Sequence, residues 1–232
     1  MTIHVQYLGH ASFKIQSEYS SIVIDPFFTG NPYSCCTVDD FIALDALLLT
    51  HGHLDHIKDA AAIAKQTECE VICGAQLADY LKTQGVADGS ITVLNVGETK
   101  TFFWGRVTAV PAVHDSFIST ESGGKLPEDD PRGYVIEVSG HKIYHAGDTM
   151  LYDKMEELNA LAIDVALLPI GGTYTMDADA AARAAALISP RVVVPMHYDT
   201  FPNIAADPQA FARKVPSAIA VSVLQSSEKE TL

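Results

Sequence analysis

Three histidines and one aspartate lie within the six residues 51–56, which read HGHLDH. An apolar run that predicts a strand precedes them, and residues two apart on an extended chain point to the same side. His51 and His53 can therefore converge on one cation, while Asp55 and His56 begin the next turn and would face a second position nearby. Neutral imidazole together with carboxylate is a ligand set that suits zinc, manganese or iron.

Two cations need more ligands than this short segment supplies, and three further candidates follow predicted strands. They are His114 after residues 107–113, Asp148 after residues 144–147, and His197 after residues 192–196. Histidine accounts for only 9 of the 232 residues, so an ordered cluster of three at 51–56 indicates metal binding rather than chance. The sequence thus offers seven candidate metal ligands.

The elements that must position these ligands follow from the spacing of apolar residues. Strands are expected at residues 3–8, 12–16, 21–25, 43–50, 70–73, 133–138, 142–145, 165–169 and 192–195, with more strands within 91–113. Helices are expected at 57–66, 75–84, 151–159 and 177–188, the last with Asp177 as its N-cap. This order predicts one α/β (α+β) domain over residues 1–232, an αββα sandwich of two mixed β-sheets flanked by helices.

Residues 115–132 form a long stretch without a periodic pattern, with two adjacent glycines, three consecutive acidic residues and two prolines. Loops of this length within compact domains often serve as lids or binding loops. Because the stretch starts directly after His114, we expect it to cover the candidate metal site; a solvated insertion without a role is the alternative. The polar residues 226–232 are expected to fray.

The composition favours some partners and excludes others. The chain has 15 lysines and arginines against 29 aspartates and glutamates, a formal charge of −14, which argues against binding to nucleic acid. No apolar run reaches the roughly 20 residues of a membrane-spanning helix, and the first five residues lack the pattern of a signal peptide. We therefore expect a cytoplasmic protein with a small-molecule substrate and reduced cysteines, and leave homo-oligomerisation open.

Together with HxHxDH and the later His, Asp and His, several shorter motifs resemble those of the metallo-β-lactamase fold superfamily. They are YLGHASF at 7–13, HAGDT at 145–149, PIGG at 169–172, YTM at 174–176 and MHY at 196–198. Within that superfamily they resemble the UPF0173 metal-dependent hydrolase group, which is similar to ascorbate-6-phosphate lactonases. The resemblance covers nearly the whole chain and is specific for fold and metal binding, whereas substrates of the group are mostly unassigned.

The resemblance implies a binuclear centre of two divalent transition-metal ions, with zinc as the first expectation and manganese or iron as alternatives. One ion would be held by His51, His53 and His114, the other by Asp55, His56 and His197, and Asp148 would bridge the two. Asp25 matches an aspartate of the superfamily that supports the ligands rather than binding metal; a simple turn residue before Pro26 is the alternative. Carboxylates in such outer positions orient imidazoles and set their tautomers.

Four residues could contribute in ways other than binding metal. Asp55 could accept a proton from the attacking water, and Tyr198, next to His197, could hydrogen-bond substrate. His10, between two predicted strands, could line the pocket as an acid or substrate donor, or be a structural loop histidine. His145 is expected either to hold a metal ligand in place without binding metal itself, or to be a buried histidine with no such role.

A metal-dependent hydrolase is therefore the expected activity. Two divalent ions, two ligand aspartates and a hydroxide carry a formal charge of about +1, and a bound metal lowers the pKa of water from 15.7 to about 7. Such a centre suits a small ester, lactone, thioester or phosphodiester. The alternatives are a di-iron redox or gas-handling protein and a metal-dependent nuclease. His53 stands where di-iron relatives have Glu, and the chain shows neither their flavodoxin domain nor the inserted arm of nuclease relatives.

Overall fold

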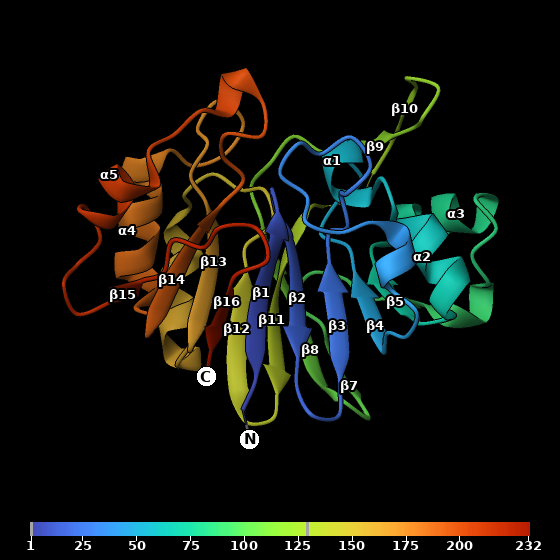
Figure 1. The fold of residues 1–232 in the computed structure, drawn as a ribbon, viewed down its shortest axis with the longest axis horizontal. Helices are drawn as coiled ribbons and strands as arrows, with labels where there is room; N and C mark the ends of the chain where they lie inside the picture. Colours follow the sequence, from blue (N-terminus) through green and yellow to red (C-terminus); the bar gives the residue numbers. More distant parts are fainter. Residues whose placement is uncertain (1, 129) are drawn as a thin grey trace.

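Two seven-stranded mixed sheets face each other in the computed structural model, which describes residues 2–128 and 130–232. Helices cover the outer face of each sheet (Figure 1), so the expected αββα sandwich is confirmed. Two residues lie outside the described part of the chain. They are Met1, in the N-terminal segment that lacks a signal-peptide pattern, and Asp129, in the predicted loop 115–132.

The first sheet is built mainly from the N-terminal half of the chain. Its strands, in spatial order, are β16 (Lys229–Thr231), β1 (His4–Gly9), β2 (Ser12–Gln16), β3 (Ser21–Ile24), β4 (Ala46–Leu48), β5 (Glu70–Cys73) and β6 (Ile91–Val93). Strands β1 to β3 pair antiparallel, and β3 to β6 pair parallel. As a result β1, β3 and β4 all run in the same direction and end at the same edge.

The second sheet is built mainly from the C-terminal half. Its order is β15 (Ala220–Val221), β14 (Val192–Met196), β13 (Val165–Pro169), β12 (His141–His145), β11 (Arg132–Val138), β8 (Gly105–Pro111) and β7 (Thr99–Phe102). Strands β12 to β15 are parallel, while β11 is antiparallel to both β12 and β8. Strands β8, β12 and β14 therefore also end at one common edge.

The helices follow the two halves of the chain. Those on the first sheet are α2 (Ala60–Thr67) and α3 (Ala75–Thr83), and those on the second are α4 (Ala178–Ile188) and α5 (Pro208–Ala212), as Figure 1 shows. The short α1 (Leu54–Ile57) lies at the end of the sheets. Single 3-10 turns occupy Val38–Asp40, Asp88–Ser90 and Pro202–Ile204, and a longer 3-10 helix spans Asp153–Leu161. Asp177 accepts a hydrogen bond from the Ala180 amide, which confirms it as the N-cap of α4.

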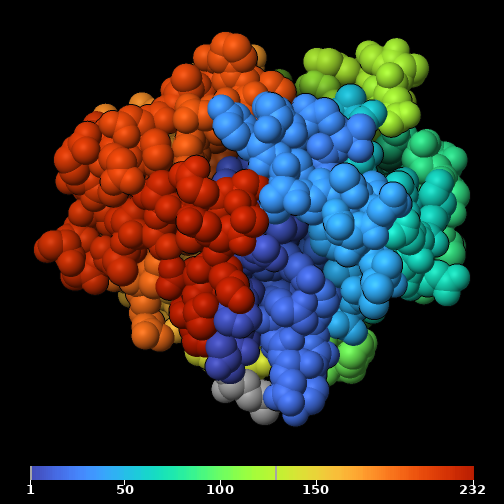
Figure 2. Space-filling model, in the orientation of Figure 1, coloured from blue at the N-terminus to red at the C-terminus, as the bar shows by residue number. Residues whose placement is uncertain are grey.

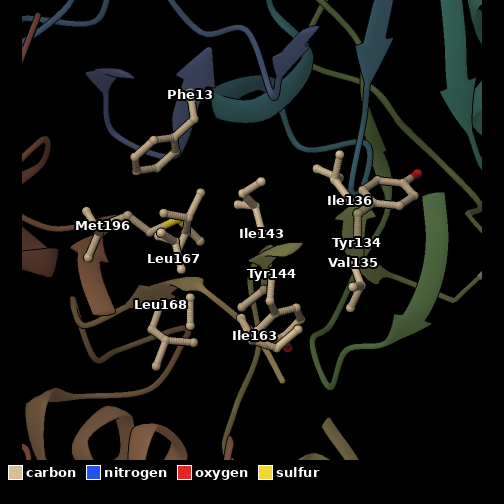
Figure 3. Close-up of a cluster of buried hydrophobic side chains, with 14 of the residues drawn as sticks. Phe13, Tyr134, Val135, Ile136, Ile143, Tyr144, Ile163, Leu167, Leu168 and Met196 are labelled. Atoms are coloured by element: carbon tan, nitrogen blue, oxygen red, sulfur yellow. The ribbon is translucent and has the colours of Figure 1, made fainter. Parts of the chain in front are cut away.

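The main apolar core lies between the two sheets. Phe13 of the first sheet and Ile143, Leu167 and Met196 of the second are fully buried in it (Figure 3). The hydroxyl of Tyr134 crosses between the sheets and donates to the carbonyl of Leu49 at 2.8 Å, so the polar end of a buried aromatic ring is satisfied. This core fixes how the ends of the two sheets meet.

Several predicted elements differ from the observed ones. The predicted helix 57–66 begins three residues later, as α2 at Ala60–Thr67, because Ile57 is the last residue of α1 and Asp59 is the N-cap residue of α2. The carboxylate of Asp59 accepts from the amides of Phe28 and Thr29. The predicted helix 151–159 is the 3-10 helix at Asp153–Leu161. The fraying predicted for residues 226–232 is wrong, because β16 pairs with β1 and adds an edge strand.

The stretch predicted as an unpatterned loop contains a small hairpin of β9 (Ile118–Ser119) and β10 (Lys125–Leu126). It projects from the body of the protein at the end that carries α1 (Figures 1 and 2). At its far end, Arg132 already belongs to β11. Among the described residues, no helix has the length and apolar character needed to cross a membrane.

Candidate metal centre

The candidate ligands, together with His10 and Asp25, gather where the carboxyl ends of strands from both sheets meet. Each follows the end of a strand or lies in the segment just beyond it: His10 after β1, Asp25 after β3, His51 to His56 after β4, His114 after β8, Asp148 after β12, and His197 after β14. Because these strands run in the same direction within each sheet, residues far apart in sequence come together at one end of the sandwich.

One group of donors, which we call the first group, consists of His51, His53, His114 and Asp148. His53 Nδ1 lies 3.1 Å from His51 Nε2 and 3.2 Å from His114 Nε2. Asp148 Oδ2 lies 3.6 Å from His114 Nε2 and 3.9 Å from His51 Nε2. Ligands at 2.0–2.1 Å around a tetrahedral ion stand roughly 3.3 Å apart, so the spacing of these nitrogens suits one bound ion.

The second group consists of His10, Asp55, His56 and His197. Asp55 Oδ2 lies 3.3 Å from His10 Nε2 and 4.0 Å from His197 Nε2. The rings of His56 and His197 are stacked with their centres 5.6 Å apart. Three of these four residues were predicted as ligands of one ion; His10 was predicted only as an acid or substrate donor.

Asp148 touches both groups. Its Oδ1 lies 3.4 Å from His56 Nε2 and its Oδ2 lies 3.0 Å from His197 Nε2, while the same Oδ2 faces the first group. The carboxylate is 3% exposed. One buried aspartate therefore stands between two sets of imidazoles, which is the position that a bridging ligand needs.

Hydrogen bonds behind the rings fix which imidazole nitrogen faces the groups. His56 Nδ1 donates to Asp25 Oδ2 at 2.8 Å, because a carboxylate can only accept. Thr50 Oγ1 donates to Asp25 at 2.6 Å and so accepts from His51 Nδ1 at 3.0 Å. His114 Nδ1 donates to the carbonyl of Tyr174 at 3.1 Å. In all three rings Nδ1 faces outward, so Nε2 is the nitrogen that faces the donor groups and would bind metal once it carries no proton.

Several buried nitrogen and oxygen atoms at this site have no hydrogen-bond partner, and they show whether metal ions fit here. Such atoms include Nε2 of His10, His56 and His197, and Oδ1 of Asp148, all at this site. Leaving one such atom unsatisfied costs about 1–3 kcal/mol. Bound cations would give each of these unsatisfied atoms a partner. The donor set therefore fits the binding of divalent ions.

The electrostatics of the site follow from burial and from mutual proximity. Burial lowers the pKa of His53 to about 4 and that of His51 well below its usual value. Burial also disfavours a charge on His56, but Asp148 and Asp25 outweigh it and raise its pKa well above the usual value. For Asp148 burial is likewise outweighed, here by His197 and His56, which hold its pKa well below the usual range.

Two glycines allow the close approach of the loops. Gly147 has φ +61° and a Cβ there would lie 2.8 Å from the Arg132 carbonyl oxygen, so only glycine lets the segment before Asp148 pass. A Cβ on Gly52 would lie 2.7 Å from the side chain of Ile118. The hairpin of β9 and β10 is thus in direct contact with the segment between His51 and His53.

A cavity of about 650 Å³ opens onto the centre. Its donor residues are His53, Asp55, His114, Asp148 and His197, and the rest of its wall includes Phe117, Lys125 and Tyr174. The loop 115–132 therefore contributes to the wall. His10 is fully buried and does not line this cavity, and Tyr198 lines a separate one, where burial, then Asp199, raises its pKa to about 12.

The two residues predicted to support the ligands occupy different positions. Asp25 is fully buried and bonded to His56 and Thr50. His145 is also fully buried, but its ring bonds to the Ala11 carbonyl and the Gly147 amide, so it holds the segment before Asp148 rather than a donor ring.

Sequence reasoning missed Thr50 and Thr200, which bond to His51 and His10 respectively. Thr50 directly precedes the HxHxDH motif, which is a signal that could have been used. Thr200 offered none, because only the fold brings it to His10.

Comparison with known proteins gives a consistent picture. The beta-lactamase superfamily domain matches residues 20–198. A protein of Thermococcus onnurineus named UPF0173 metal-dependent hydrolase is 44% identical over 97% of this chain and 98% of its own, and one of Pyrococcus furiosus with the same name is 42% identical over 97% and 98%. Among solved structures, Igni18, described as a novel metallo hydrolase from Ignicoccus hospitalis, superposes with a TM-score of 0.86 at 36% identity and covers 100% of this chain and 99% of its own.

Proposed function

Because the chain belongs to the beta-lactamase superfamily and, within it, to the UPF0173 metal-dependent hydrolases, we propose that it hydrolyses a small ester, lactone, thioester or phosphodiester at a centre of two divalent metal ions. The observation that carries the proposal is the meeting of two donor groups at Asp148, at the base of an open cavity. A fold alone does not specify a substrate.

The proposal divides the residues by what they hold. His51, His53 and His114 hold one ion, Asp55, His56 and His197 hold the other, and Asp148 binds both. Zinc is the first expectation, with manganese and iron as alternatives, since all three accept imidazole and carboxylate. When bound, the two ions supply a hydroxide from water near neutral pH and an electrophile for the scissile oxygen.

Side chains of the protein would carry out proton transfer, orientation of the ligands and contact with the substrate. Asp55 lines the cavity and has two carboxylate oxygens, so one can serve the donor group while the other accepts a proton from the attacking water. Asp25 holds His56 by accepting the Nδ1 proton, which keeps the Nε2 lone pair directed inward. Phe117, Lys125 and Tyr174 form the wall that would contact the substrate.

The size and charge of the protein favour a small substrate. The chain carries a formal charge of −14, which opposes the approach of a long polyanion, and the structure places one Lys or Arg, Lys125, among the described cavity-lining residues. A small molecule with one carbonyl or phosphoryl oxygen meets less repulsion, since charges beyond ~8 Å are largely screened at physiological salt.

Reconstitution followed by a substrate screen tests the proposal. Metal-free protein is loaded with excess zinc or manganese, its metal content is measured by elemental analysis, and generic ester, lactone, thioester and phosphodiester substrates are assayed. We expect two ions per chain and turnover of at least one class, lost in His51→Ala and retained in the control His141→Ala, whose ring lies 3.8 Å from Asp164 away from the centre.

Three results would contradict the proposal. Less than about one ion per chain after loading would remove the two-metal centre. Native iron with electron transfer but no hydrolysis would favour the redox alternative. Efficient degradation of transfer RNA or single-stranded DNA that His51→Ala abolishes would favour a nuclease.

A further inference from the structure

His10 lies in the turn between β1 and β2, fully buried, with its backbone in an uncommon conformation. Its φ is +61°, in the left-handed region that few residues other than glycine adopt. Two hydrogen bonds hold the carbonyl of this residue: the His197 amide donates to it at 2.8 Å and the Tyr7 hydroxyl at 3.2 Å. The turn is therefore tied directly to the residue that follows β14 in the other sheet.

This backbone places the His10 ring among the donors of the second group. The ring centre lies 4.2 Å from that of His197 and 5.5 Å from that of His56. On the outer side, His10 Nδ1 is 2.8 Å from Thr200 Oγ1. On the inner side, Nε2 is buried and has no hydrogen-bond partner. One nitrogen of the ring is thus anchored and the other faces the group.

The contact of His10 Nε2 with Asp55 has the spacing of two ligands. Nε2 lies 3.3 Å from Asp55 Oδ2, which is longer than the roughly 2.7–2.9 Å of a charge-assisted hydrogen bond. Two ligands bound to one ion at 2.0–2.1 Å stand roughly 3.3 Å apart at a tetrahedral angle. The nitrogens of the first group show nearly the same separation, 3.1 Å between His51 Nε2 and His53 Nδ1.

From this geometry we propose that His10 is a metal ligand, an eighth donor that binds the second ion through Nε2. The inference rests on the proposed two-metal centre. Thr200 Oγ1 accepts the Nδ1 proton of His10, which leaves the Nε2 lone pair free, as Asp25 does for His56. The second group then has four donors of its own and receives Asp148 in addition.

An additional protein donor distinguishes the second ion from the first. With Asp148 counted at both ions, the first group supplies four donors and the second group five. His10 fills a position at the second ion from the buried side, away from the cavity. The second ion is consequently the more tightly held of the two.

The competing role for His10 is to position Asp55 without binding metal. In that case Nε2 carries the proton and donates to Asp55, and the Thr200 hydroxyl donates to Nδ1. The two roles predict opposite protonation of the ring, which gives a direct measurement that does not depend on turnover.

The test is nuclear magnetic resonance of full-length protein labelled with nitrogen-15 in histidine and loaded with cadmium-113. The His10 signals are those that disappear in His10→Ala or, if that variant does not fold, in His10→Asn. We expect scalar coupling between His10 Nε2 and cadmium, and the proton on Nδ1. A proton on Nε2 without coupling to cadmium would overturn the proposal.

The same spectra separate failure of this inference from failure of the proposed function. If His56 and His197 couple to cadmium and His10 does not, the metal centre stands and His10 is not a ligand. If no histidine couples, the metal centre itself is wrong.

Metal affinity gives a second measurement, by competition with a coloured chelator. We expect His10→Ala to weaken the tighter of the two zinc constants by about 100-fold or more, beyond the usual effect of losing an outer partner. The control His141→Ala should change neither constant, and unchanged constants in His10→Ala would count against the proposal.

Discussion

The two donor groups differ in what holds them in place. The first group is supported partly from the surface: the Gly52 amide donates to Glu128, the Gly52 carbonyl accepts from the Ser119 amide, and the ring of Phe117 lies 4.4 Å from that of His53. The second group is supported from the core, by the buried side chains of Asp25 and Thr200 and by the turn at His10.

This difference predicts that the groups respond to different changes. Alterations of the segment 116–128 should act on the first group and on the substrate, since that segment both lines the cavity and contacts Gly52. Alterations of Asp25, Thr200 and the turn at His10 should act mainly on the second group. Asp148 belongs to both and should not discriminate between them.

The largest effect is expected from Asp148→Ala. Removing this carboxylate takes a donor from both groups and leaves Nε2 of His56 and of His197 without the carboxylate that they share, so both metal affinities and nearly all hydrolysis should be lost. The decrease should exceed the roughly 100-fold upper range for loss of an outer partner. Metal content and turnover of zinc-loaded protein measure it, with His141→Ala as the control. Wild-type activity in Asp148→Ala would exclude the residue from the mechanism.

An intermediate effect is expected from Asp25→Asn. The substitution keeps the shape of the side chain but removes the anion that accepts from His56 Nδ1, and we expect a roughly 10- to 100-fold loss of affinity or activity. The constant of the second ion should change more, although Asp25 also reaches His51 through Thr50. Titration with a competing chelator measures both constants. Equal loss at both ions would show that the groups are not independently supported.

The smallest effect on metal binding is expected from replacing residues 119–126 by a short glycine and serine linker. The change removes Lys125 from the cavity wall but keeps Phe117 and Glu128. We expect the KM or the order of substrate preference to change by about threefold to tenfold, an energy of the size of one hydrogen bond, while metal content stays at two ions. Loss of metal from this variant would mean that the hairpin has a structural role at the first group.

The sequence alone determined most of the strands, because local patterns and local partners decide them. Residues 12–16, 70–73 and 165–169 were predicted with their observed bounds. The strand predicted at 43–50 is shorter, Ala46–Leu48, and beyond its end the amide and hydroxyl of Thr50 bond to Asp25 instead of continuing the ladder. That bond joins residues 25 positions apart, so no local pattern could reveal it.

The sequence also predicted that the centre binds metal, since imidazoles and carboxylates at the spacing HxHxDH indicate metal binding whatever the surrounding fold is. What only the tertiary structure decided is how the donors are grouped. His10 joins Asp55, His56 and His197 because β1 and β14 lie in different sheets that end at the same place. Likewise Tyr198, next to His197 in sequence, faces another cavity, because adjacent side chains point in different directions.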